Sequence, residues 1–202
     1  MRLSNLVRDD RGWETRARVD RYADDHLEVV TEDVKTPSHT QARNWTTAYR
    51  KPAIVVAAMT RDGKFLLVQQ ERIPIRTAIW EMPGGQIDDS VEPDQKQIEE
   101  TALRELREET GYQLGSDGEL IALGDFFSSP GFTNEHGYLF LARPVELHSG
   151  AARDETESIL DCRAFAPAEL RRMIAQNEIR DANTLSICAR LATRGFFSLS
   201  PD

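Results

Sequence analysis

The feature that most constrains this chain is a helical segment, predicted over residues 93–110 with Pro93 in its first turn, that carries carboxylates beside its apolar row. Three apolar residues recur at a spacing of four on one face of this helix: Ile98, Ala102 and Leu106. On a helical wheel Glu109 lies about 40° from Glu105, and Glu108 lies about 60° to the other side. The three acids therefore straddle the edge of the stripe that the helix buries.

Two like charges one turn apart repel each other, and partial burial raises the free-energy cost of both. A positive group must therefore compensate Glu105 and Glu109. Arg104 and Arg107 are nearby candidates, and a divalent cation is the stronger one, because clustered hard oxygen ligands suit Mg²⁺ or Mn²⁺. The alternative is a solvated charged helix with ion pairs such as Arg104–Glu108.

The residues before this helix predict strands. A continuous apolar run over residues 53–59 is typical of a strand covered on both faces, and an Asp-Gly turn joins it to a second strand at 65–70 as a hairpin. A third strand at 79–82 ends at Pro83-Gly84-Gly85. The remaining predicted elements are strands at 119–127, 137–144 and 158–165 and helices at 167–177 and 182–193. This order indicates a mixed β-sheet between helices, fold class α/β of the α+β type.

Residues 1–50 are polar with short alternating stretches, which predict a small N-terminal β subdomain. It has too few strands to bury a core of its own, so we expect it to pack on the main domain, residues 51–202, or on another subunit. Trp13 is interpreted as a core residue.

The net charge of −9 argues against a general nucleic-acid or membrane-surface binder. It does not exclude a phosphorylated substrate, because bound cations can reverse the sign of the local charge at a site. No apolar run is long enough for a membrane span, and no secretory signal is visible. Cys162 and Cys188 are isolated in sequence, which predicts neither disulfides nor zinc and favours a cytoplasmic protein.

Residues 104–112 read Arg-Glu-Leu-Arg-Glu-Glu-Thr-Gly-Tyr. This segment resembles the second half of the Nudix hydrolase box at every fixed position, and it follows a strand and a Pro-Gly-Gly turn as in that family. The resemblance implies a Nudix-like mixed β-sheet sandwiched between helices.

The first half of the box departs from the pattern. Gly85 lies 19 positions before Arg104, which leaves about five more residues than the pattern has. Lys96 occupies the place of the first Glu of the box. In the family that Glu usually pairs with the box Arg, so Glu92 or Glu99 is expected to serve here instead.

The resemblance extends to the ADP-ribose pyrophosphatase and nucleoside diphosphate sugar hydrolase branch of the family. It rests on four segments: residues 70–74, 80–88, 129–135 and 179–184. Members of the branch are typically homodimers that exchange the N-terminal β domain. They use Mg²⁺, with Mn²⁺ as an alternative, to hydrolyse the diphosphate bond to a nucleoside monophosphate and a sugar phosphate.

By this resemblance Glu105, Glu108 and Glu109 hold the metal ions, and the carbonyl of Gly84 adds an oxygen ligand. The resemblance places Glu108 among the catalytic residues, together with Arg104. Metal ions at this position neutralise the phosphate oxygens and lower the pKa of an attacking water.

A loop Glu after the box is the expected general base, and both Glu155 and Glu157 match in different members. Arg72 matches a position that touches the diphosphate, and Glu81 is an additional acid of the site. Trp45 matches an aromatic residue that stacks on the base. The alternatives are a surface ion pair for Arg72, a strand-edge residue for Glu81, a core Trp for Trp45 and solvated acids for the two loop residues.

Two other functions are weighed against this one. A non-catalytic nucleotide sensor would have the same fold, but the intact Glu cluster disfavours it. A Nudix hydrolase of dinucleotide polyphosphates or capped RNA remains an alternative, although the net charge of −9 makes long RNA less attractive.

Overall fold

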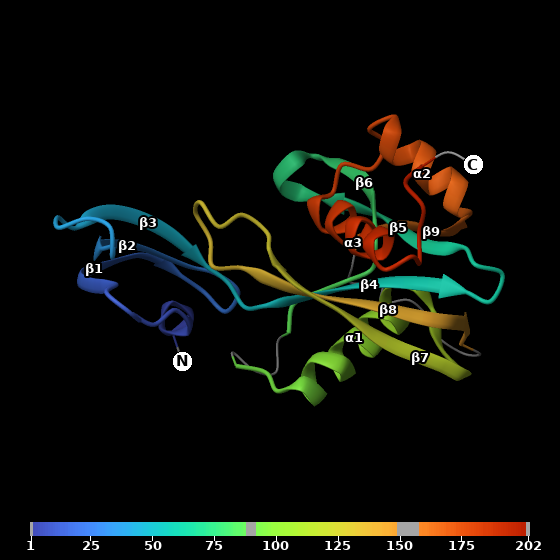
Figure 1. Ribbon diagram of the computed structural model, residues 1–202, viewed down its shortest axis with the longest axis horizontal. Helices are drawn as coiled ribbons and strands as arrows, with labels where there is room; N and C mark the ends of the chain where they lie inside the picture. The colour runs from blue at the N-terminus through green and yellow to red at the C-terminus, as the bar shows by residue number, and fades with distance from the viewer. Residues whose placement is uncertain (1, 88–91, 149–157, 201–202) are drawn as a thin grey trace.

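The computed structural model describes residues 2–87, 92–148 and 158–200, and it contains two separate β-sheets (Figure 1). The first is antiparallel and has the order β1-β2-β3, with β1 at Glu14–Ala23, β2 at Glu28–Lys35 and β3 at Arg43–Tyr49. A short 3-10 helix, η1 (Leu3–Leu6), packs on this sheet. In Figure 1 the sheet extends away from the larger body of the molecule.

The second sheet has six strands in the order β6-β5-β4-β8-β7, with β9 paired to β5. Its strands are β4 (Ala53–Thr60), β5 (Phe65–Arg72), β6 (Thr77–Glu81), β7 (Tyr112–Phe127), β8 (His136–Leu147) and β9 (Ile159–Phe165). The sheet is mixed, because β4 and β8 run parallel while the other pairs are antiparallel. The predicted hairpin of β4 and β5 and the predicted mixed sheet are confirmed.

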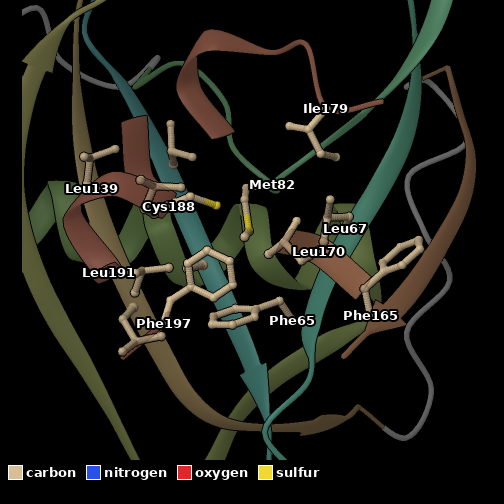
Figure 2. Packing of buried hydrophobic residues seen from close by; sticks show 14 of the residues in the cluster. Phe65, Leu67, Met82, Leu139, Phe165, Leu170, Ile179, Cys188, Leu191 and Phe197 are labelled. Atoms are coloured by element: carbon tan, nitrogen blue, oxygen red, sulfur yellow. The ribbon is translucent and has the colours of Figure 1, made fainter. Parts of the chain in front are cut away.

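Helices cover both faces of this sheet (Figure 1). Along β4, Val55 and Ala57 belong to the apolar cluster under α2 (Pro167–Ala175) and α3 (Ala182–Thr193), which Figure 2 shows. Ile54 and Val56 belong to a second cluster, under α1 (Gln95–Thr110). Successive side chains of a strand point to opposite faces, so a strand between two layers needs the continuous apolar run seen in the sequence.

Strands β4 and β5 pair only beside their connecting turn, at Ala58–Leu66 and Met59–Phe65. Beyond it the free edge of β4 is taken by residues 83–86, which we call the Gly-Gly turn. The N–H of Val56 donates to the carbonyl of Pro83 at 2.8 Å, and the N–H of Ile54 donates to that of Gly85 at 2.8 Å. The separation of the two strands therefore makes room for the Gly-Gly turn inside the sheet.

Helix α1 begins at Gln95, two residues later than predicted, because Asp94 rather than Pro93 is at its start. The Asp94 carboxylate accepts from the Gln97 N–H at 2.8 Å, and the Gln97 side chain accepts from the Asp94 N–H at 3.0 Å. This capping box satisfies two backbone donors that a helix start leaves open. Gly111 ends the helix with φ of 75°, a left-handed value that suits glycine.

Several further bounds differ from the predictions; β5 ends at Arg72 rather than at residue 70, and β8 spans His136–Leu147 rather than 137–144. Strand β7 begins at Tyr112 rather than at residue 119, β6 spans Thr77–Glu81 rather than 79–82, and α2 ends at Ala175 rather than at 177. Alternating patterns near strand ends are weak, and pairing with a neighbour decides the length. Helix α3 has the predicted bounds.

The interpretation of Trp13 as a core residue is wrong, because 51% of its surface is exposed. The small core of the first sheet consists instead of Leu3, Val30 and Tyr49. The boundary at residue 50 between two domains stays a prediction. No helix within the described ranges is long and apolar enough to cross a membrane.

Candidate active site

Helix α1 presents its acids to the Gly-Gly turn. Glu105 and Glu109 lie on the buried side of the helix and are 5% and 2% exposed, while the side chain of Glu108 is 38% exposed. The apolar row of Ile98, Ala102 and Leu106 is buried beside them. The sequence prediction that carboxylates share the buried side of this helix is therefore confirmed for Glu105 and Glu109.

The backbone of the Gly-Gly turn contacts these acids directly. The Gly84 N–H donates to Oε2 of Glu109 at 2.9 Å. On either side of Gly84, the carbonyls of Pro83 and Gly85 accept from β4, so the Gly-Gly turn bonds β4 and the helix acid at once.

Both glycines of the turn lie very close to other groups. A Cβ on Gly85 would lie 2.6 Å from Cδ of Glu105, and a Cβ on Gly84 would lie 2.3 Å from the carbonyl oxygen of Ile54. Real Cβ atoms do not approach other atoms so closely. At Gly84 the obstacle is backbone of β4, so only glycine fits there, whereas a side chain at Gly85 would displace the Glu105 carboxylate.

Arg104 supplies the positive charge that these acids need. Its Nη2 lies 2.6 Å from Oε1 of Glu105, and its Nη1 lies 2.6 Å from Oε2 of Glu108. Burial lowers the pKa of the Arg104 guanidinium, but the nearby charges of Glu105 and Glu108 outweigh this and raise the pKa above its ordinary value. Arg104 thus stays charged and bridges two of the expected metal ligands.

The acids expected to replace the first Glu of the motif bind other groups. Glu92 forms an ion pair with Arg8 at 2.6 Å, and Glu99 accepts from the Gln95 side chain at 2.6 Å. Lys96, at the place of the missing Glu, lies 3.4 Å from a carboxylate oxygen of its own helix. The expectation that Glu92 or Glu99 is the partner of Arg104 is therefore replaced by the pairs that Arg104 makes with Glu105 and Glu108.

Arg72, at the end of β5, is held by the buried carboxylate of Glu81 on β6. Its Nε donates to Oε1 of Glu81 at 2.8 Å, and its Nη2 bonds the other carboxylate oxygen. The hydrogen bond to Glu81 is the main cause that raises the pKa of Arg72, and the charges of Asp181 and Glu109 act in the same direction. Arg72 therefore lies within the electrostatic reach of the acid cluster and keeps a partly exposed side chain.

Trp45 lies on β3, and 55% of its surface is exposed. Its Nε1 donates to the carbonyl of Gly131 at 3.1 Å, and the Ala48 N–H donates to the Phe132 carbonyl at 2.8 Å. Strand β3 is thus joined to the loop of residues 128–135, which includes the SPGFTNE segment. The interpretation of Trp45 as a core residue is excluded by its exposure.

The structure brings Gly84, Glu105, Glu108, Glu109 and Arg104 into one cluster, and the charge of Glu109 also acts on the pKa of Arg72 in the Arg72–Glu81 pair. Glu155 and Glu157, the expected general bases, lie outside the described residues. Within the described ranges, no three His, Cys, Asp or Glu side chains converge closely enough to hold a metal ion. The acids instead bind Arg104 and the Gly84 N–H.

The donor set nevertheless fits a hard divalent cation. The three carboxylates and the Gly84 carbonyl are all oxygen donors, and the two glycines keep the space beside them free of side chains. Sequence reasoning did not find the contact between Gly85 and Glu105. The adjacent pair of glycines was the signal for it, because a backbone that must approach another group closely needs residues without Cβ.

Comparison with known proteins identifies the family. The NUDIX domain model matches residues 49–186. An ADP-ribose pyrophosphatase of Bacillus subtilis is 29% identical over 78% of this chain and 80% of its own length. A methanol dehydrogenase activator of Bacillus methanolicus is 30% identical over 79% of this chain and 81% of its own. This chain belongs to the NUDIX family.

A solved structure supports the same fold. The crystal structure of an ADP compounds hydrolase superposes with a TM-score of 0.73, and the match covers 94% of this chain and 100% of that chain. The two sequences are 17% identical, so this likeness concerns the fold alone. The predicted Nudix-like sheet between helices is confirmed.

Proposed function

We propose that this chain hydrolyses the diphosphate bond of ADP-ribose or a related nucleoside diphosphate sugar, with Mg²⁺ or Mn²⁺ as the metal. The observation that carries the proposal is the pair of buried carboxylates, Glu105 and Glu109, that face the Gly-Gly turn. Two charged carboxylates in one buried site repel each other, and clustered oxygen donors of this kind suit hard cations in a site for phosphates. The similarity to an ADP-ribose pyrophosphatase supports this substrate class.

We assign the metal ligands to Glu105, Glu108, Glu109 and the Gly84 carbonyl. A divalent cation held by these oxygens would neutralise phosphate oxygens and lower the pKa of the attacking water. The Arg104 guanidinium pairs with Glu105 and Glu108 and offsets part of their negative charge.

Arg72 donates its remaining N–H groups to the diphosphate, and Glu81 fixes the plane of its guanidinium through two hydrogen bonds. The water oxygen forms a bond to phosphorus, the bond from phosphorus to the bridging oxygen breaks, and the water proton passes to a base. We assign that base to Glu155 or Glu157. The products are a nucleoside monophosphate and a sugar phosphate.

The test is a panel of diphosphates incubated with the purified chain and MgCl₂, with products separated by chromatography. The panel contains ADP-ribose, GDP-mannose, a dinucleotide polyphosphate and a capped RNA. Release of nucleoside monophosphate from the first two, abolished by EDTA, is the expected result. Cleavage of only the last two would move the chain to another substrate class, and binding without cleavage would indicate a sensor.

Trp45→Ala is expected to raise KM for ADP-ribose by about 5- to 150-fold with little change in kcat. The exposed indole supplies a stacking face for the base, and stacking on an aromatic side chain is worth about 1–3 kcal/mol. Steady-state kinetics checks this, with Trp45→Phe expected to fall in between. Trp13→Ala is the matched control, since Trp13 is similarly exposed. An unchanged KM in Trp45→Ala would remove Trp45 from the substrate site.

The homodimer that the resemblance implies stays a prediction. Light scattering in solution checks it, and a mass twice that of the 22.9 kDa chain is expected. A mass equal to that of one chain would contradict it.

A further inference from the structure

We propose that Arg50 is a positioning residue that fixes the Gly-Gly turn through Gln86 and ties it to the loop of residues 128–135. This inference rests on the proposed function, in which the Gly-Gly turn supplies a metal ligand. Arg50 lies between β3 and β4, where the chain passes from the first sheet to the second. None of the assigned ligands or substrate contacts includes it.

The main chain of Arg50 is held on both sides by one side chain. Its N–H donates to Oδ1 of Asn134 at 2.8 Å, and its carbonyl accepts from Nδ2 of Asn134 at 3.1 Å. An amide side chain offers the same donor and acceptor pair as a backbone peptide, so Asn134 acts here as a neighbouring strand would. These two bonds fix where the Arg50 side chain begins.

The guanidinium of Arg50 joins two further elements. Its Nη1 lies 2.7 Å from Oε1 of Glu135, whose other carboxylate oxygen accepts from the Ser128 hydroxyl at 2.8 Å. With the Gln86 amide oriented to satisfy its surroundings, its oxygen accepts from Nη2 of Arg50 at 2.7 Å and from Nε at 3.2 Å. Arg50 thus connects the loop of residues 128–135 to the last residue of the Gly-Gly turn.

Gln86 transmits this connection to the metal ligands. Gln86 follows Gly85 in the chain and pairs with Ala53 of β4. The carbonyl of Gly85 accepts from the N–H of Ile54, the next residue of β4. Two residues before Gln86, Gly84 binds Glu109 and carries the carbonyl that we assign to the metal. A displacement of Gln86 therefore moves the backbone that contacts the acid cluster. Among the described residues, the ion pair of Arg50 is with Glu135 and not with Glu105, Glu108 or Glu109.

The test measures amide hydrogen exchange at Ile54, Val56 and Gly84 in the metal-free chain, followed by calorimetric titration with Mn²⁺. A hydrogen bond to a charged group is worth about 1.5–3 kcal/mol, so Arg50→Met is expected to speed exchange at these amides by about 10- to 100-fold and to weaken Mn²⁺ binding. Gln86→Met is expected to do the same, and the double variant to add little beyond either change. Gln86→Glu keeps an acceptor for the guanidinium and is expected to retain slow exchange.

Arg61→Met is the matched control, because Arg61 also pairs with a carboxylate, that of Asp117, but in the turn at the far end of β4. Unchanged exchange in both Arg50→Met and Gln86→Met would overturn the proposal. A higher KM for ADP-ribose with unchanged exchange and Mn²⁺ affinity would also overturn it, and would make Arg50 a substrate ligand. If Arg50→Met does not fold, the comparison of amide exchange in Gln86→Met and Gln86→Glu tests the proposal.

The outcome does not depend on the substrate. Exchange and Mn²⁺ binding report on the Gly-Gly turn even if the parent chain cleaves none of the diphosphates in the panel. Failure of the proposed function would then appear as inactivity of the parent, while failure of this inference would appear as unchanged exchange in the variants.

Discussion

Glu108→Gln is expected to lower kcat for ADP-ribose on the order of 10²–10³-fold, the size found when one preorganised electrostatic group is removed from an active site. Glutamine keeps the shape of the side chain and removes the charge that would hold the metal. Glu108 is the most exposed of the three acids and pairs with Arg104 on its own helix, so the fold should survive. The measurement is steady-state kinetics with saturating MgCl₂, together with a thermal unfolding curve.

The control for this change lies on the same helix. Glu100 is exposed and pairs with Lys96 at 3.4 Å, so Glu100→Gln removes the same charge without touching the cluster. It is expected to keep the parent kcat, because an exposed pair of this kind contributes little. A Glu108→Gln variant that turns over ADP-ribose at the parent rate would exclude Glu108 from metal binding and catalysis.

Glu108 is the better target than its neighbours because its role can be separated from folding. Glu105 and Glu109 are buried, and each contacts the Gly-Gly turn. Neutralising either would leave Arg104 or the Gly84 N–H with a weaker partner, so lost activity could reflect lost structure.

The sequence predicts those parts of the fold that depend on local periodicity. The apolar row of Ile98, Ala102 and Leu106 places Glu105 and Glu109 on the buried side, because helix geometry alone relates residues three to four apart. The continuous run in β4 likewise predicts burial on both faces. Such patterns indicate which side of an element is buried, but they do not indicate which other element covers it.

What the sequence could not predict depends on partners far away in the chain. Nothing local shows that β5 leaves β4 after Leu66 and admits the Gly-Gly turn. The pair of Arg104 with Glu108 is different, because it follows the i, i+4 spacing of one helix and is among the alternatives that the sequence offers.

Two of the three tryptophans show the same limit. Trp13 and Trp45 have similar local surroundings in the sequence and are similarly exposed, but Trp45 donates to a loop 86 residues away. The long-range hydrogen bond distinguishes the two side chains, and it cannot be read from periodicity.

Gly85→Ala is expected to leave the chain folded while it weakens Mn²⁺ binding on the order of 10–100-fold, the loss typical when the support of a metal ligand is disturbed. The new Cβ would lie 2.6 Å from Cδ and 2.7 Å from both carboxylate oxygens of Glu105. These atoms are the far end of a flexible side chain, so the carboxylate can move, and it then leaves the position that we assign to a ligand. The measurements are calorimetric titration with Mn²⁺ and kcat with saturating MgCl₂.

Gly84→Ala provides the contrast, because its Cβ would meet the backbone oxygen of Ile54 at 2.3 Å. A backbone atom in the sheet cannot yield as a side chain can, so this variant is expected to lose about 1–3 kcal/mol of unfolding free energy. Glu105→Asp in the Gly85→Ala background withdraws the carboxylate by one methylene and is expected to restore part of the Mn²⁺ affinity. If Gly85→Ala bound Mn²⁺ as tightly as the parent, the Glu105 carboxylate would not be a metal ligand, and the Gly-Gly turn would serve packing alone.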